Sequence, residues 1–190
     1  MKRIGILGGT FNPIHIGHLT IAQMVREQMK LDKVLFIPLN LPPHKSGKFV
    51  VSAKDRYHMV RLAIHGNPYF EISDFEIEKI GKSYSIDTVN YFHNLFGRGT
   101  KFFFIIGSDL LPTLHTWRRI NDIQKIVTFV AAHRPGFKEK KSKVKVKLVT
   151  IPSLQTSSSY VRQRITSGKT VKYLVPDSII KYIVDKKLYR

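Results

Sequence analysis

The feature that most constrains the fold of this sequence is a glycine-rich turn between a short apolar segment and an amphipathic one. Residues 4–7 form an apolar run bounded by glycine, which predicts a buried strand. Over residues 17–29 apolar side chains recur at helical spacing, which predicts a helix that begins near His15. Between them, Gly8 and Gly9 allow the backbone to turn sharply. The sequence therefore predicts a strand, a tight turn and a helix N-terminus in succession.

The backbone of this turn suits a nucleotide phosphate. The first N–H groups of a helix have no partner within the helix, and the helix dipole also favours an anion there. Glycine leaves room for phosphate oxygens to approach the backbone closely. We therefore expect the residues of the turn to bind the phosphates of a nucleoside triphosphate: Gly8, Gly9, Thr10 and Phe11.

Two histidines follow at the start of the predicted helix. His15 and His18 lie three residues apart and hence on one helix face, and Gly17 is expected to keep that face open to a bulky ligand. The alternative is that both histidines are ordinary polar residues of a helix start. The turn lacks the Gly-Lys-Ser/Thr of a P-loop and the G-x-G-x-x-G of dinucleotide-binding domains, which excludes those two kinds of phosphate site.

Length and composition favour one globular domain, residues 1–190. The chain has 190 residues, of which 43% are hydrophobic and 11% aromatic, enough for a substantial core. No apolar run approaches the roughly 20 residues that span a bilayer, and no signal peptide is recognisable. Because the sequence also has no cysteine, it favours a cytoplasmic protein without disulfides or thiolate metal sites.

The charge balance predicts anionic partners. Lysine and arginine number 32 against 13 aspartate and glutamate residues, a formal net charge of +19. An RNA-binding module is therefore the alternative function from a different class. The cations are spread along the chain, densest at residues 138–147, without the aromatic motif or zinc knuckle of common RNA-binding modules. We therefore favour small phosphorylated substrates and a solvated basic surface, with no specific nucleic acid.

Strand and helix patterns alternate along the chain, which is typical of an α/β fold with a mostly parallel sheet. Strands are expected at residues 4–7, 34–38, 70–73, 101–106, 127–132 and 144–151. Helices are expected at 17–29, at 53–65, up to 96 after a cap at Ser83 or Ser85, from 121, from 158 and at 176–186. The predicted fold is a single Rossmann-like, doubly wound sheet with helices on both faces. In its last strand, near the sheet edge, we expect Val144, Val146 and Leu148 to face inward.

Polar clusters follow the ends of the predicted strands. In an open parallel sheet, ligands bind at the carboxyl ends of the strands, near the point where the strand order reverses. Lys45 ends a stiff Leu-Pro-Pro-His-Lys loop and is either a phosphate ligand or a solvated lysine. Gly107 would let an adenine or ribose lie on the backbone, and Asp109 is either a ribose ligand or a helix N-cap. We expect these clusters to converge on one crevice.

Two further segments suit ligands. Trp117, the only tryptophan, is either a partly exposed lid of the core or a stacking platform for a flat ring. Residues 156–159 are four consecutive hydroxyl residues before a predicted helix, and Arg162 follows one turn later. Since simple capping needs only one hydroxyl, we expect a second phosphate cradle that includes Ser158 and Arg162.

These motifs, in this order, resemble those of a known family. Residues 8–19 are similar to the Gly-Thr-Phe-x-Pro-x-His-x-Gly-His signature of the nucleotidyltransferase superfamily, and the chain as a whole resembles the bacterial nicotinate-nucleotide adenylyltransferases. The resemblance rests on residues 8–19, 41–45, 84–88, 106–109 with Trp117, 134–136 and 156–162. It implies transfer of AMP from ATP to nicotinate mononucleotide with release of pyrophosphate. The alternative is another nucleotidyltransferase of this superfamily with a different phosphorylated acceptor.

The resemblance also implies roles for single residues. The implied catalytic residues are His15, His18 and Arg162, and the further ATP-binding residues are Gly107, Asp109, Arg134 and Ser158. The acceptor would be held by Lys45, Ser85 and Trp117, with the indole stacked on the pyridine ring. Mg²⁺ is expected to arrive bound mainly through ATP, without a metal site on the protein. We also expect the phosphates to keep His18 charged in the complex.

Three positions depart from the pattern of that family. Asn12 stands where the family usually has aspartate, which makes the expected phosphate site more positive. Ser85 stands where it usually has threonine, so the hydroxyl is kept but the methyl group is lost. Thr156 and Ser159 replace isoleucine and threonine of the late motif.

Overall fold

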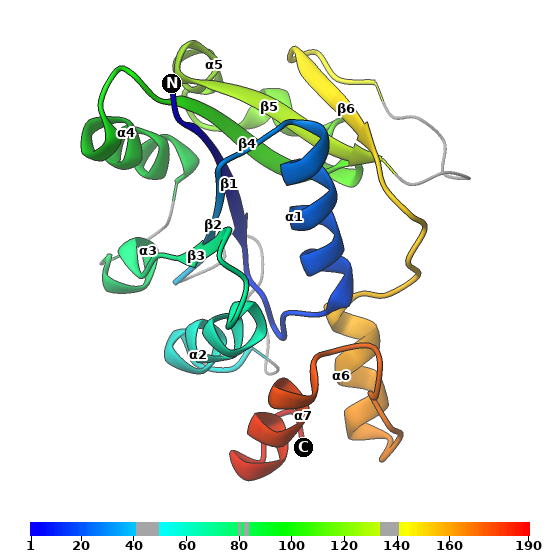
Figure 1. The fold of residues 1–190 in the computed structure, drawn as a ribbon. Helices are drawn as coiled ribbons and strands as arrows, with labels where there is room; N and C mark the ends of the chain where they lie inside the picture. Colours follow the sequence, from blue (N-terminus) through cyan, green and yellow to red (C-terminus); the bar gives the residue numbers. More distant parts are fainter. Residues whose placement is uncertain (41–49, 80, 82–83, 134–140) are drawn as a thin grey trace.

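The computed structural model describes residues 1–40, 50–79, 81, 84–133 and 141–190, and these build a six-stranded sheet (Figure 1). The strand order is β3-β2-β1-β4-β5-β6, and every neighbouring pair of strands is parallel. The strand order reverses between β1 and β4, as in doubly wound nucleotide-binding sheets. The predicted Rossmann-like fold class is confirmed.

The strands are β1 (Arg3–Gly9), β2 (Lys33–Pro38), β3 (Phe70–Ile72), β4 (Lys101–Gly107), β5 (Val127–His133) and β6 (Val146–Thr150). The helices are α1 (Ile16–Gln28), α2 (Ala53–Ile64), α3 (Phe75–Glu78), α4 (Ser85–Phe96), α5 (Ile120–Ile126), α6 (Ser158–Thr166) and α7 (Asp177–Asp185), with 3₁₀ turns at Ser108–Leu110 and Leu114–Thr116. Most bounds lie within two residues of those expected from periodicity. None of the helices in the described ranges is long and apolar enough to cross a membrane.

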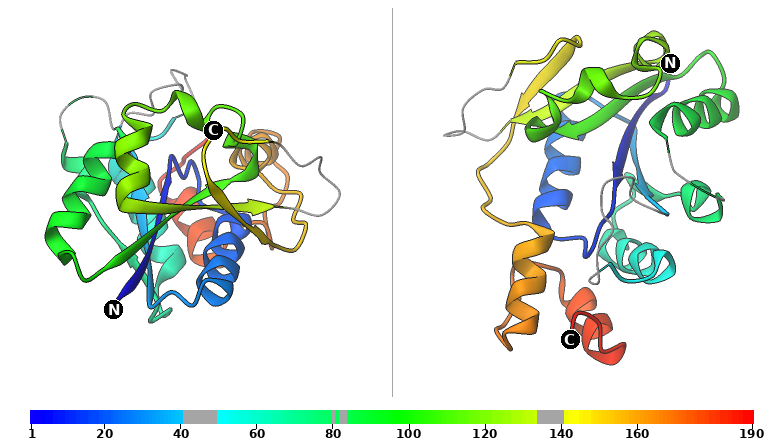
Figure 2. Two further views of the ribbon diagram at one scale, coloured as in Figure 1. Left: turned by 90° about the horizontal axis from the view of Figure 1, so that it is seen from above. Right: turned by 180° about the vertical axis from the view of Figure 1, so that it is seen from behind.

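The core has two halves, one on each face of the sheet. Because side chains alternate along a strand, Ile6 and Leu7 of β1 point to opposite faces. Ile6 belongs to the cluster that α4 and α5 cover, and Leu7 belongs to the cluster that α1, α2, α6 and α7 cover. In every view α4 and α1 lie on opposite sides of β1 (Figure 2). The predicted placement of helices on both faces is confirmed.

Two local predictions are wrong. Ser85 does not cap α4, because it is the first residue of that helix and Tyr84 occupies the N-cap position; the other candidate, Ser83, lies outside the described residues. We expected the side chain of Leu148 in the last strand to face inward, but it is 46% exposed. Helix α1 packs against β6 on the opposite face, so Val149 is buried there instead. The prediction that this strand lies at the sheet edge is confirmed.

A buried arginine ties together the segments that follow the first two strands. The side chain of Arg56 on α2 is 1% exposed. It donates hydrogen bonds to the carbonyl oxygens of Thr10 at 2.8 Å, Leu39 at 2.6 Å, Asn40 at 2.7 Å and Val51 at 3.2 Å. Burial lowers its pKa from the usual value, but a guanidinium keeps its charge in proteins. The planar guanidinium thus fixes the turn after β1 relative to the chain that leaves β2.

We predict that Arg56→Lys lowers the free energy of unfolding by about 2–4 kcal/mol, since a single ammonium cannot reach carbonyls on all three segments and leaves some of them unpaired. Arg61→Lys is the matched control, because Arg61 lies on the same helix, is exposed and contacts only the ring of His58 in the described contacts. It should change stability by less than about 0.5 kcal/mol. Urea unfolding followed by circular dichroism measures both; equal effects of the two variants would refute the role given to Arg56.

Candidate active site

The turn after β1 leads directly into the N-terminus of α1. His15 is the N-cap residue, with extended backbone angles of φ −143° and ψ 170°. Its carbonyl oxygen accepts the first helical hydrogen bond, from the N–H of His18 at 2.9 Å. The prediction that the helix begins near His15 is confirmed. Two of the first three N–H groups of α1 already have backbone partners, because Ile16 donates to the carbonyl of Leu174 and His18 to that of His15, each at 2.9 Å. The expected phosphate site therefore relies mainly on the side chains around the turn.

Phe11 folds back over the glycines of the turn. Its φ of 48° lies in the left-handed region, and its side chain is 2% exposed. A Cβ atom on Gly9 would lie 3.0 Å from the Phe11 ring, so glycine at position 9 lets the ring close over the backbone. The same ring meets the imidazole of His18 edge-on, with centroids 5.1 Å apart. Phe11 thus supports the position of His18 from the core side.

The two histidines share one face, as predicted, but they differ in exposure. Their ring centroids are 3.7 Å apart. His15 is 4% exposed, whereas His18 is partly exposed. The N–H of His15 donates to Nδ1 of His18 at 3.2 Å. A ring nitrogen that accepts a hydrogen bond carries no proton, so with this bond formed His18 is neutral and its proton lies on Nε2, where it can be donated to a phosphate. The charged His18 expected in the complex would require this bond to break.

Gly17 has a different role from the one expected. The glycine is buried, and a Cβ atom there would lie 3.0 Å from the His15 ring and 3.1 Å from Cγ2 of Thr156. The segment before α6, and not a ligand, therefore lies against this glycine. Glycine is needed here so that this segment can pack against the start of α1.

The hydroxyl-rich segment lies against the turn after β1, so α6 begins beside the start of α1 (Figure 1). Ser157 is the N-cap of α6, and its hydroxyl accepts from the N–H of Tyr160. Ser158 Oγ donates to the carbonyl of Pro13 at 2.9 Å, and Arg162 Nη1 donates to the carbonyl of Asn12 at 2.8 Å.

These contacts bring the two predicted phosphate-binding segments together: the turn after β1 and the hydroxyl-rich start of α6. Nη2 of Arg162 donates to Ser159 Oγ at 3.1 Å, and the arginine is partly exposed. Arg162 and His18 therefore flank the same short turn, and both residues are partly exposed. A guanidinium and an imidazole placed together in this way can bind a polyphosphate.

At the carboxyl end of β4, Gly107 and Asp109 lie against each other. The Asp109 carboxylate occupies the space where a Cβ of residue 107 would stand, and its side chain is exposed. The N-cap of the 3₁₀ turn that follows is Gly107, so the alternative reading of Asp109 as an N-cap is wrong. An exposed carboxylate beside a glycine at a strand end is suited to accept hydrogen bonds from a ribose.

Trp117 follows the second 3₁₀ turn. Its structure fits both predicted roles, a partly exposed lid of the core and a stacking platform for a flat ring. Its indole meets Phe104 of β4 and Phe129 of β5 edge-to-face, at centroid distances of 5.7 and 6.1 Å. The indole is only partly buried, so the core fixes its orientation while part of the ring remains accessible. Tyr84 packs against the same apolar cluster, which brings Ser85 at the start of α4 to this side of the molecule.

Two features near the site were not predicted from the sequence: the buried Arg56 and the contact between Arg118 and Tyr84. Arg56 shares a helix face with the buried Met59 and Val60, and a lone arginine on an apolar helix face was the available signal. Arg118 places its guanidinium 4.6 Å from the centroid of the Tyr84 ring, a contact that no sequence spacing predicts. Lys45 and Arg134, which were also singled out, lie outside the described residues.

Comparison with known proteins identifies the family. The cytidylyltransferase-like family matches residues 6–164. A protein of Thermoanaerobacter sp. (strain X514) named "Probable nicotinate-nucleotide adenylyltransferase" is 42% identical over 99% of this chain and 94% of its own length. One of Oceanobacillus iheyensis with the same name is also 42% identical, over 100% of this chain and 97% of its own length.

Solved structures agree on the fold. The Plasmodium falciparum nicotinic acid mononucleotide adenylyltransferase complexed with NaAD has a TM-score of 0.82 at 22% identity and covers 100% of this chain and 98% of its own. The same enzyme complexed with APC has a TM-score of 0.80 at 21% identity, with the same coverage. The sequence matches along the whole chain and the shared architecture lead to one conclusion: this chain belongs to the cytidylyltransferase-like family and, within it, to the nicotinate-nucleotide adenylyltransferases.

Proposed function

We propose that the chain transfers AMP from ATP to nicotinate mononucleotide and releases pyrophosphate, giving nicotinate adenine dinucleotide. The observation that carries this proposal is the meeting of α1 and α6 at one turn, where Arg162 is bonded to the Asn12 carbonyl and His18 has its proton on Nε2. The full-length similarity to nicotinate-nucleotide adenylyltransferases supports the choice of acceptor.

The reaction needs positioning and charge stabilisation rather than a nucleophile on the protein. An oxygen of the acceptor phosphate attacks the α-phosphorus of ATP, the new P–O bond forms, and the bond to the β-phosphate oxygen breaks. Negative charge accumulates on the departing pyrophosphate. Donors that point to this charge lower the barrier, and we assign that role to the side chains of His18 and Arg162. Ser158 and the buried His15 fix the geometry of this group.

The two substrates would meet near the carboxyl ends of β1 and β4. Gly8, Gly9, Thr10 and Phe11 belong to the phosphate turn, and Asp109 beside Gly107 would accept the ribose hydroxyls of adenosine. Trp117 would stack on the pyridine ring, with Ser85 and the N-terminus of α4 near its carboxylate. Lys45 and Arg134 remain proposals that the family resemblance alone supports.

Magnesium is the expected metal, and we propose that it is held mainly by the triphosphate. Across the described ranges, no group of three or more His, Cys, Asp and Glu residues stands close enough to hold a metal ion. When bound, Mg²⁺ would neutralise charge on the phosphate oxygens. The cationic side chains derived above would act alongside it.

We also propose that residues 1–190 form one nucleotidyltransferase domain that works in the cytoplasm. The family match over residues 6–164 and a sheet that draws strands from residue 3 to residue 150 support the first part. The absence of cysteine supports the second.

The direct test is pyrophosphate release with ATP, Mg²⁺ and a set of acceptors. We expect rapid release with nicotinate mononucleotide and at least tenfold lower kcat/KM with nicotinamide mononucleotide, phosphopantetheine and glycerol phosphate. The reason is that a carboxylate near a helix N-terminus and a hydroxyl gains charge-assisted bonds that an amide lacks. Equal rates with the two pyridine nucleotides would refute the assignment of acceptor.

Trp117→Ala should raise the KM for nicotinate mononucleotide about tenfold or more and leave the KM for ATP within about twofold, because only one substrate stacks on the indole. Trp117→Phe keeps an aromatic face and should recover most of the loss. Steady-state kinetics with each substrate varied separately measures this. A larger effect on the KM for ATP than on that for the acceptor would contradict the placement.

His18→Ala should lower kcat about 100-fold to 1,000-fold, because it removes a donor that acts on charge developing in the transition state. His65→Ala is the control, since His65 is exposed at the end of α2 and should leave kcat within about twofold. Thermal unfolding of both variants checks that the fold is kept. A loss of less than tenfold in kcat for His18→Ala would exclude a catalytic role.

A further inference from the structure

A tyrosine near the end of the sequence is hydrogen-bonded to the turn between β1 and α1. Tyr189 follows α7, and its side chain is 6% exposed. Its hydroxyl donates to Oδ1 of Asn12 at 2.8 Å, a buried contact across 177 positions of sequence. The same Oδ1 accepts from the N–H of Val51 at 3.3 Å. The Asn12 amide, itself 4% exposed, is therefore held by donors from two distant segments.

This contact completes the fixing of the turn. The carbonyls of Asn12 and Pro13 are bound by Arg162 and Ser158 from α6, which holds the backbone. The side chain of Asn12 adds a further attachment of the turn, and Tyr189 and the N–H of Val51 both bind it. Because the turn connects β1 to α1, its orientation determines where His18 and the N–H groups of α1 point.

A tyrosine hydroxyl is already protonated at neutral pH, and the surroundings of Tyr189 extend the range over which it stays so. Burial raises the pKa of Tyr189 above its usual value, and the nearby guanidiniums of Arg162 and Arg56 oppose this rise without cancelling it. Asp55 also raises the pKa of Tyr189. The hydroxyl therefore stays protonated over the range in which an enzyme of this kind works, and the bond to Asn12 persists there.

We propose that Tyr189 is a positioning residue for ATP: through the amide of Asn12, it holds the β1–α1 turn in the orientation that presents His18 and Arg162 to the triphosphate. The proposal rests on the proposed function, since it assumes that this turn binds ATP. It assigns no contact between Tyr189 and either substrate.

Tyr189→Phe tests this, because it removes only the hydroxyl and keeps the ring in the core. We expect the KM for ATP to rise about fivefold, the amount that one lost buried hydrogen bond supports, while the KM for nicotinate mononucleotide stays within about twofold. Calorimetric titration with a nonhydrolysable ATP analogue should show the same loss of affinity without turnover.

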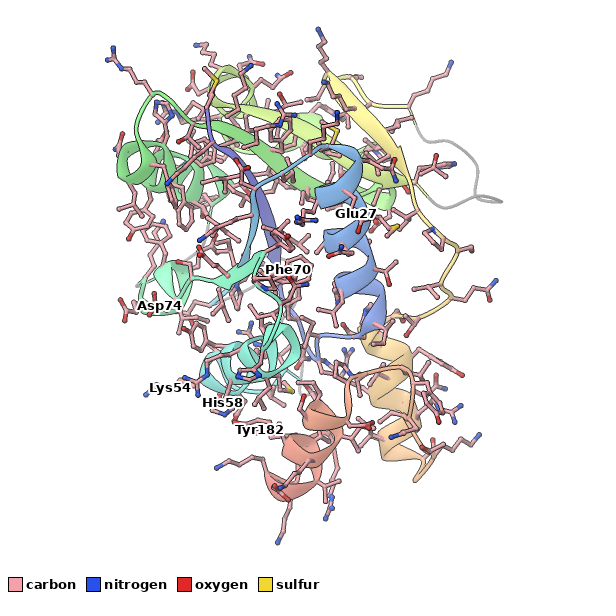
Figure 3. The ribbon with its side chains drawn as sticks, in the orientation of Figure 1. Glu27, Lys54, His58, Phe70, Asp74 and Tyr182 are labelled. Atoms are coloured by element: carbon pink, nitrogen blue, oxygen red, sulfur yellow. The ribbon has the colours of Figure 1, made fainter. Side chains whose placement is uncertain are left out.

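Tyr182→Phe is the matched control. Tyr182 lies on α7, donates its hydroxyl to Asp55 at 2.8 Å and stacks on the ring of His58 on α2 (Figure 3). Neither of these contacts of its side chain is with the β1–α1 turn. Its pKa is raised to about 12, first by burial and then by Asp55, so it is also a protonated donor at neutral pH. It should lower the melting temperature about as much as Tyr189→Phe does, with the KM for ATP within about twofold of the unaltered protein.

A double-mutant cycle tests whether Tyr189 acts through Asn12. If it does, Asn12→Ala combined with Tyr189→Phe should bind the ATP analogue no more weakly than Asn12→Ala alone. Additive losses, an unchanged affinity in Tyr189→Phe, or equal increases in the KM of both substrates would overturn the proposal. Failure of the unaltered protein to release pyrophosphate would refute the proposed function instead, and the analogue titration would still report on Tyr189.

Discussion

The geometry of the candidate active site depends on which groups donate hydrogen bonds to the backbone carbonyls of the turn after β1. Residues between a strand and a helix cannot pair their backbone within either element, and buried carbonyls left unpaired are costly. Here the donors are side chains: Arg56 for Thr10, Arg162 for Asn12 and Ser158 for Pro13. They come from α2 and α6, so the turn acquires a fixed shape only when the whole chain has folded. That shape aims the start of α1 and the imidazole of His18.

The position of this turn in the sheet explains why two substrates can meet there. The strand order reverses between β1 and β4, and ligands of doubly wound sheets bind at such a point. Helices α1 and α6 belong to the core half on one face, whereas α4 and Trp117 belong to the other. The proposed triphosphate site and the proposed acceptor site thus derive from opposite faces and share one edge of the sheet.

Much of this architecture was predictable, because it follows from local periodicity. The elements, their parallel arrangement, the start of α1 at His15 and the shared face of His15 and His18 each depend on residues close in sequence. The predictions for Leu148 and Gly17 were wrong because distant segments, α1 and the residues before α6, decide the environments of these two residues. The predicted cap at Ser85 was wrong by one residue. The contact between Tyr189 and Asn12 spans 177 positions and has no sequence signature, so only the folded structure reveals it.

The central claim is that the β1–α1 turn holds the triphosphate, with Nε2 of His18 as a donor. The most direct measurement is the ¹⁵N NMR spectrum of the His18 imidazole, with and without a nonreactive ATP analogue. In the free protein the proton should lie on Nε2 alone, since Nδ1 accepts from the His15 N–H. With the analogue bound, the Nε2 resonance should shift and keep its proton. Resonances of His18 that do not change at saturating analogue would contradict the account.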